Sequence, residues 1–176
     1  MNVQRMCRIA LMAALICVAA PLAIPVGAVP ITLATFAVYL AGFCLGPWEG
    51  TAAVAIYLLL GAVGVPVFSG FSGGAARLVG ATGGYLWGYL PCALLTGLAA
   101  KRYADCAWKS VAGMVMGTAV LYAIGTAWFL CVMPTTFAGA MASCVLPFLP
   151  GDAIKIAAAV LVGRQVKKRL KRFLES

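Results

Sequence analysis

The stretch Pro147–Arg172, PFLPGDAIKIAAAVLVGRQVKKRLKR, combines a Pro/Gly break, a pair of opposite charges and an apolar run that ends in a basic cluster. An apolar run that stops at clustered basic residues is typical of a helix that crosses a bilayer and ends at its cytoplasmic surface. Asp152 and Lys155 lie at the other end of this run, three residues apart, and therefore share one helix face. Charges are costly inside a bilayer, so this pair needs an explanation.

The composition of the whole chain is that of a membrane protein. Of its 176 residues, 64% are hydrophobic and 10% are charged, whereas about 25% charged residues is normal for a soluble domain. Forty uncharged residues separate Arg8 from Glu49, and 42 separate Lys109 from Asp152. A spanning helix needs roughly 17–25 apolar residues, so segments of this length predict several spans. We therefore predict an all-α, polytopic integral membrane protein.

Clusters of proline and glycine divide the chain into six predicted spans, which would form a compact bundle in a single transmembrane domain over residues 1–176. The second and third spans are short, about 22 Å at 1.5 Å per residue, so they would thin the bilayer or end inside the protein around a cavity. The Gly-rich segment 64–84 and the segment 133–150 are expected to be irregular, with one helical turn near 75–79. The six spans are about residues 6–20, 31–45, 49–63, 85–100, 110–132 and 151–170.

The Lys and Arg residues predict the topology. Eleven of the 13 fall in segments that face the cytoplasm if both termini are inside, which predicts an N-in, C-in protein with an even number of spans in the cytoplasmic membrane. Arg77 and Lys155 are the two exceptions. The long irregular connections lie on the outer half, and irregular backbone at membrane depth must be buried in protein or line a cavity. This predicts an outward-facing pocket.

The N-terminal segment has two interpretations. Arg5 and Arg8 before an apolar run also fit a secretory signal peptide. The multispan character of the rest of the chain favours a first helix that is retained.

Two explanations remain open for the charged pair. In the first explanation, Asp152 is simply a helix cap after Pro150, and Lys155 is its partner. Alternatively, the pair forms a polar floor under a bound ligand. Helix rise places Lys155 about 18 Å from Lys167, near the middle of the membrane, and this favours the ligand site.

Other polar residues of the outer half are candidates for the same site. Thr32 and Thr35 would offer hydroxyl groups to a ligand, or would bond to the backbone where a helix begins. Arg77 would contact an anionic ligand or act in a gate, or would face water. These alternatives stay open from the residues alone.

Several activities are excluded or unsupported by the sequence. The chain has no G-x-x-x-x-G-K-[ST] motif, so it does not hydrolyse ATP through a P-loop. It has no His, and its seven Cys show no C-x-x-C spacing, so we expect no metal site, no cofactor and no enzymatic activity. The basic segment 167–172 is most simply an anchor at anionic lipid of the bilayer, with no role for nucleic acid.

Two pairs of small residues have the spacing that lets helices approach closely in a membrane. Ala10 and Ala14 form one pair, and Gly113 and Gly117 form the other. Each would serve either packing within the chain or contact with a partner protein.

The order of these motifs resembles the BioY family, the biotin-binding substrate components of energy-coupling factor (ECF) transporters. The resemblance covers nearly the whole chain. The family often has Gln where Ala34 stands between the threonines, and some members have Asn in the region of Phe68–Phe71. The family's Gly-Pro-Thr-Gly-Gly corresponds to GATGG at residues 80–84. The matching segments are VPITLAT (29–35), LAG (40–42), LGP (45–47), YLLLGA (57–62), GVPVF (64–68), SGG (72–74), GATGGYL (80–86), YAIGT (122–126) and PFLPGD (147–152) with Lys155.

This resemblance implies high-affinity capture and uptake of biotin, with ATP hydrolysis in separate subunits. The implied partners are a transmembrane coupling protein, which would dock on Ala10 and Ala14, and two cytoplasmic ATPases. Asp152 would accept from a ureido N–H, and Lys155 would donate to a ligand oxygen. The other implied site residues are the hydroxyl donors Thr32 and Thr35, the apolar walls Phe36, Phe68 and Tyr85, and the lid or gate residues Gly70, Ser72, Gly73, Gly74 and Arg77. Two rival functions are transport of another vitamin and a structural or assembly role without a ligand.

Overall fold

The computed structural model describes the backbone of residues 2–24, 30–103 and 107–174, and the side chains of 2–24, 30–103 and 110–166. Within these residues the chain forms eight helices and one two-stranded sheet. The strands β1 (Ala23–Ile24) and β2 (Ile31–Thr32) pair antiparallel. The helices are α1 (Val3–Ala19), α2 (Ala34–Leu45), α3 (Pro47–Val63), α4 (Ala75–Val79), α5 (Gly83–Arg102), α6 (Ala107–Val132), α7 (Phe137–Cys144) and α8 (Leu149–Leu174).

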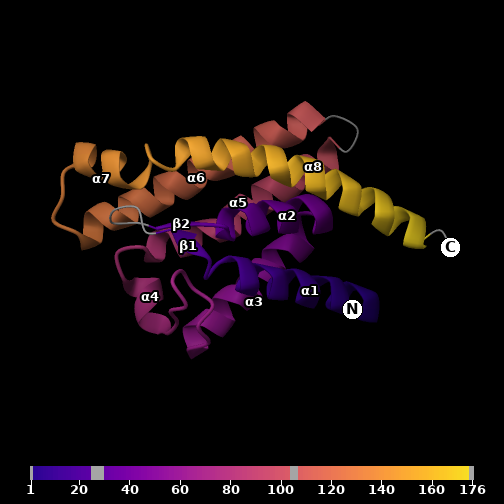
Figure 1. Ribbon diagram of the computed structural model, residues 1–176, viewed down its shortest axis with the longest axis horizontal. Coiled ribbons are helices and arrows are strands. Elements are labelled where there is room, and N and C mark those ends of the chain that lie inside the picture. The colour runs from indigo at the N-terminus through magenta and orange to yellow at the C-terminus, as the bar shows by residue number, and fades with distance from the viewer. Residues whose placement is uncertain (1, 25–29, 104–106, 175–176) are drawn as a thin grey trace.

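The long helices form three layers, with α2 and α5 in the middle (Figure 1). Helices α1 and α3 cover one side of this middle layer, and α6 and α8 cover the other (Figure 1). Helix α2 packs against α1, α3, α5 and α8, while α5 packs against α2, α3, α4 and α6. The core therefore follows α2, where Ala37, Val38 and Ala41 have no exposed surface.

Glycine and proline set the boundary between α2 and α3. Helix α2 ends at Leu45 because Gly46 adopts φ +84°, a conformation that other residues rarely adopt. Pro47 then begins α3, where its missing N–H costs nothing because the first helical N–H groups have no intrahelical acceptor. This junction fixes where α2 ends and where α3 begins.

Small residues let the middle layer pack closely. A Cβ atom at Gly97 of α5 would lie 2.5 Å from the nitrogen of Pro47. The Gly113/Gly117 pair serves contact within the chain, because Cβ atoms there would lie 2.1 Å from the Cβ of Ala99 and 3.0 Å from the carbonyl oxygen of Cys92. This pair therefore packs α6 on α5.

The segment predicted to be irregular between 133 and 150 differs from expectation. It contains the helix α7 (Phe137–Cys144), which begins at an N-cap where the Thr136 side chain accepts from the N–H of Gly139 at 3.3 Å. Helix α8 begins at Leu149, slightly before the expected start, and is bent by 44° from α7. Pro147 and Pro150 favour a break in the chain, although proline is tolerated in the first turn of a helix. The single turn expected near 75–79 is present as α4.

The helices differ in their ability to cross a bilayer unaided. Among the described helices, Ser110–Val132 is by itself long and apolar enough to span, and Phe137–Cys144 with Leu149–Val166 qualifies if the bent pair is counted as one span. Ala34–Leu45 and Pro47–Val63 are apolar but shorter. Their shortness agrees with the expectation for the second and third predicted spans.

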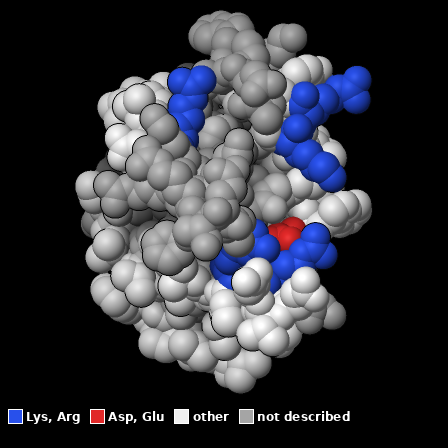
Figure 2. Space-filling model, turned by 90° about the vertical axis from the view of Figure 1, so that its right-hand side faces the viewer, with Lys and Arg blue, Asp and Glu red and all other residues white. Residues whose placement is uncertain are grey.

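The two ends of the molecule differ in character. Helix α1 begins and α8 ends at the same end of the long axis, whereas α4, α7 and the β1–β2 sheet lie toward the opposite end (Figure 1). On the end near the termini, Lys and Arg side chains form separate groups, one of which adjoins an acidic group (Figure 2). There Arg5 forms an ion pair with Glu49 at 3.0 Å, and both line a hollow of about 400 Å³ together with Lys101.

Candidate functional site

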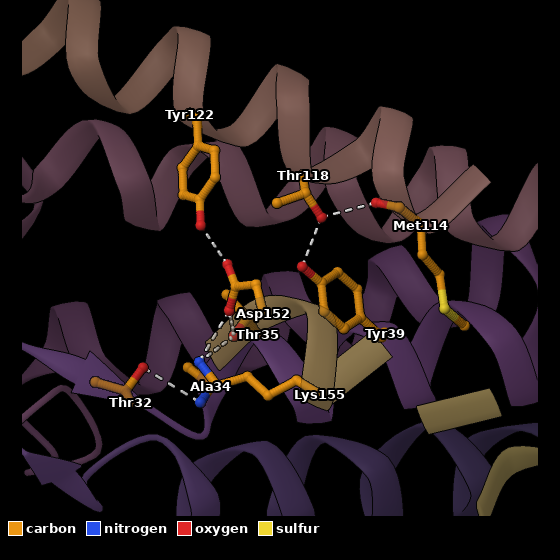
Figure 3. A network of polar contacts seen from close by, with 9 residues as sticks. All are labelled: Thr32, Ala34, Thr35, Tyr39, Met114, Thr118, Tyr122, Asp152 and Lys155. Atoms are coloured by element: carbon orange, nitrogen blue, oxygen red, sulfur yellow. Dashed lines mark hydrogen bonds and ion pairs between the residues drawn. The ribbon is translucent and has the colours of Figure 1, made fainter. Parts of the chain in front are cut away.

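A buried polar cluster joins the middle layer to α6 and α8 (Figure 3). The Lys155 amine donates to Asp152 Oδ1 at 3.0 Å and to Thr35 Oγ1 at 3.0 Å. The Thr35 hydroxyl in turn donates to Asp152 Oδ1 at 3.2 Å. Tyr122, from α6, donates to the second oxygen, Oδ2, at 2.5 Å. The cluster thus draws residues from three helices that are far apart in the sequence.

The charges of this cluster are almost completely buried. Asp152 is 3% exposed and Lys155 is 9% exposed. Removing one partner of a buried ion pair leaves an uncompensated charge, at a cost of about 3–5 kcal/mol. The pair itself carries no net charge. The cluster is therefore a neutral floor that still offers strong donors and acceptors.

This floor lies at the base of a small cavity of about 40 Å³. Its volume suits a small polar group and is too small for a whole vitamin. Apart from the charged pair and two threonines, the residues that line the cavity are aromatic or apolar. The lining residues are Pro30, Thr32, Thr35, Tyr85, Tyr89, Leu121, Tyr122, Cys144, Phe148, Asp152 and Lys155.

A wider cavity of about 500 Å³ adjoins the small one. The two share Pro30, Thr32, Tyr85 and Tyr89, so they form an inner and an outer chamber of one site. The outer chamber reaches the Gly-rich segment before α5. Its remaining lining residues are Ala23, Phe68, Ser69, Gly70, Ser72, Arg77, Thr82 and Leu86.

The structure brings most of the expected ligand-binding residues together. Asp152, Lys155 and Thr35 line the inner chamber, Thr32 and Tyr85 line both chambers, and Phe68 lines the outer one. Thr32 also accepts from the N–H of Ala34 at 3.3 Å. This threonine therefore lines the chambers and also bonds to the backbone where α2 begins, so the two alternatives do not exclude each other.

Phe36 differs from the other expected walls. It is not among the described residues that line either chamber, and it packs partly buried against the hydrophobic core. It follows Thr35 by one residue on α2, and consecutive helical residues point about 100° apart. The helix face that directs Thr35 at the site therefore directs Phe36 elsewhere.

The expected lid residues divide into two groups. Gly70, Ser72 and Arg77 line the outer chamber. Gly73 and Gly74 are not among its described lining residues, and a Cβ at Gly73 would lie 2.5 Å from the carbonyl oxygen of Val65. Gly73 therefore allows two backbone segments to pack closely.

Sequence reasoning predicted Tyr85 but missed two other tyrosines of the site. Tyr122 and Tyr89 line the inner chamber. Tyr39, which is not among the described lining residues of either chamber, is fully buried, and its hydroxyl lies 2.6 Å from Thr118 Oγ1. Because Thr118 donates its own proton to the carbonyl oxygen of Met114 at 2.8 Å, Tyr39 is the donor in this bond. The sequence could have pointed to these tyrosines because each lies within an apolar run, and a buried tyrosine O–H needs a hydrogen-bond partner.

Outside the site, Ala10 and Ala14 lie exposed on α1, whereas Ile9, Ala13 and Ile16 of the same helix are buried. The small-residue pair therefore faces away from the bundle. Among the described residues, no group of His, Cys, Asp or Glu side chains is arranged to hold a metal ion.

Comparison with known proteins gives a consistent result. The model of the BioY family matches residues 1–172. The biotin transporter BioY of Thermotoga maritima is 43% identical over 88% of this chain and 90% of its own length, and the probable biotin transporter BioY of Pyrococcus horikoshii is 37% identical over 95% and 98%.

A solved structure has the same fold. The crystal structure of the S-component for biotin from an ECF-type ABC transporter superposes with a TM-score of 0.88, at 30% identity, covering 94% of this chain and 92% of that chain. On its sequence and its fold, this chain belongs to the BioY family.

Proposed function

We propose that this protein is the biotin-binding substrate component of an ECF-type transporter and captures biotin for uptake across the cytoplasmic membrane. The observation that carries the proposal is the buried, neutral Asp152–Lys155 pair at the base of a two-chambered cavity. Membership of the BioY family supports the choice of ligand.

The hydrogen-bonding capacity of the floor suits a ureido group. Lys155 has three N–H bonds and uses two of them on Asp152 and Thr35. The third is available to a ligand carbonyl oxygen. On Asp152, Oδ1 accepts two hydrogen bonds and Oδ2 accepts one, so Oδ2 can accept another from a ligand N–H. A urea offers this carbonyl and N–H side by side.

The same floor suits a carboxylate poorly, because Asp152 would repel a second negative charge. The biotin carboxylate therefore points the other way, into the outer chamber. Arg77 supplies a cation there, and Ser69 and Ser72 also line this chamber. Between the two polar ends, Tyr85, Tyr89 and Phe68 surround the apolar rings and chain of the ligand.

We further propose six transmembrane helices, with both termini in the cytoplasm. The six proposed transmembrane helices are α1, α2, α3, α5, α6 and α8. Of these, α2 and α3 are short, and neighbouring helices pack against them on several sides. The gathering of Lys and Arg at the end near the termini supports this orientation (Figure 2). In this proposed orientation, the outer chamber faces the outside of the cell.

The proposed transporter has three further subunits: a transmembrane coupling protein and two cytoplasmic ATPases that hydrolyse ATP. The coupling protein would dock on the exposed Ala10/Ala14 face of α1, where small side chains permit close approach. Docking would let the unit tip in the membrane and release biotin inside. No bound cofactor is needed for this cycle.

Thermal stabilisation of the purified protein tests the ligand. Micromolar biotin should raise the melting temperature, whereas thiamine and riboflavin at the same concentration should not. Stabilisation by another vitamin alone would reassign the substrate. Stabilisation by none of them would favour a structural or assembly role.

A further inference from the structure

Tyr122 approaches the charged pair from the side opposite Thr35. It stands on α6, lines the inner chamber and donates to Asp152 Oδ2 at 2.5 Å (Figure 3). A phenol O–H on a carboxylate is a charge-assisted bond and is stronger than a neutral one. Tyr122 thus acts on the oxygen that the proposed ligand uses.

The two oxygens of Asp152 have different surroundings. Oδ1 accepts from Lys155 and Thr35, which are themselves joined by a hydrogen bond. This triangle alone does not fix the rotation of the carboxylate about its last bond. The bond from Tyr122 to Oδ2 adds a second point of attachment and holds that oxygen away from Lys155.

We propose that Tyr122 is the positioning residue that keeps Asp152 Oδ2 available to a ligand N–H and thereby contributes to selectivity for the ureido group. This inference rests on the proposed binding of biotin. It adds a residue from α6 to a floor otherwise made by α2 and α8.

Removing the hydroxyl has a definite consequence. In Tyr122→Phe, Asp152 would be free to turn Oδ2 toward the third N–H of Lys155. Lys155 would then donate to both oxygens of Asp152. The donor and the acceptor that match the ureido group would occupy each other, so the ligand would have to separate them before binding.

A purely structural role for Tyr122 is the alternative, because its hydrogen bond also links α6 to α8. Tyr39→Phe provides a matched control. It removes one buried hydroxyl, and Thr118 still donates to Met114. Tyr39 is not among the described residues that line the chambers.

The test measures affinity by calorimetry for the full-length wild-type protein, Tyr122→Phe and Tyr39→Phe. The ligands are biotin and two analogues methylated at one or the other ureido nitrogen. We expect Tyr122→Phe to bind biotin about tenfold more weakly, a difference of roughly 1.4 kcal/mol, and Tyr39→Phe to bind it like the wild type. The wild type should bind one methylated analogue much more weakly than biotin. In Tyr122→Phe the ratio of these two affinities should be at least threefold smaller.

This loss of discrimination at one nitrogen is the signature of positioning, and a structural role would not produce it. Wild-type affinity in Tyr122→Phe would overturn the inference. An equal loss for biotin and for both analogues would also overturn it, by assigning Tyr122 to the fold. If the wild type itself did not bind biotin, the proposed function would fall first, and this result is distinct from both others.

Discussion

At the residue scale, we propose that the buried Asp152–Lys155 pair recognises a neutral polar group. Asp152 and Lys155 cancel each other's charge, yet each keeps hydrogen-bonding capacity that points into a cavity. Each half of the pair therefore depends on the other. Altering one half should change the preferred charge of the ligand as well as its affinity.

Lys155→Met tests this dependence. Without the ammonium group, the ureido carbonyl loses its donor, so biotin should bind at least tenfold more weakly. The cationic analogue 2-iminobiotin presents a guanidinium group, which would compensate the remaining Asp152 charge. Its affinity relative to biotin should rise at least tenfold in competition calorimetry.

The double variant Lys155→Met with Asp152→Asn is the control for folding. It restores neutrality, so it should recover the thermal stability that the single variant loses while still binding biotin poorly. Unchanged biotin affinity in Lys155→Met would remove Lys155 from the site.

At the element scale, the sequence predicted the long helices better than their connections. Apolar runs bounded by Gly and Pro located α2, α3 and α6 closely, because burial and helix length constrain them strongly. Helix α7 was missed because the prolines that flank its apolar, small-residue sequence were given more weight than its Thr136 cap.

The site was predicted in part, for a similar reason. Asp152 and Lys155 stand out from an apolar sequence by their charge. Tyr122 and Tyr89 resemble ordinary core aromatics, and only their contacts with the chambers distinguish them. Phe36 was expected in the site but is not among the described residues that line it. Although it follows Thr35 in the sequence, it lies on a different face of the helix.

Close packing between α5 and the α2–α3 junction predicts the effect of a larger side chain. Gly97→Val would place Cβ 2.5 Å from Pro47, and overpacking of this kind costs about 1–3 kcal/mol. We expect a lower melting temperature in detergent. Gly151→Ala is the control, because a Cβ there meets nothing within 4 Å. Equal stability of the two variants would contradict the close packing.

The exposed face of α1 predicts a separation between binding and assembly. Ala10→Trp or Ala14→Trp should prevent copurification with the proposed coupling protein, because a bulky ring blocks close helix approach. Biotin affinity of the isolated variants should stay at the wild-type level. Leu161→Trp, at a position 66% exposed on α8, should leave both properties intact. Loss of biotin binding in a folded Ala10→Trp protein would argue against this separation.

At the scale of the whole molecule, the polarity of the two ends predicts how the protein sits in a membrane. A cysteine introduced at Ser69, in the wall of the outer chamber, should react with a membrane-impermeant thiol reagent added outside intact cells. A cysteine at Arg5, within the basic end, should react only after the cells are opened. The background needs the native cysteines replaced by alanine or serine. The opposite labelling pattern would reverse the proposed topology.

The neutrality of the Asp152–Lys155 pair also has an electrical consequence. An isolated charge that crosses the full membrane potential does work of about 2.3 kcal/mol per 100 mV. Two opposite charges whose nitrogen and oxygen lie 3.0 Å apart travel together and contribute almost no net work. A rotating or tipping unit can therefore carry this pair across the field in either direction, and the membrane voltage does almost no work on the pair itself.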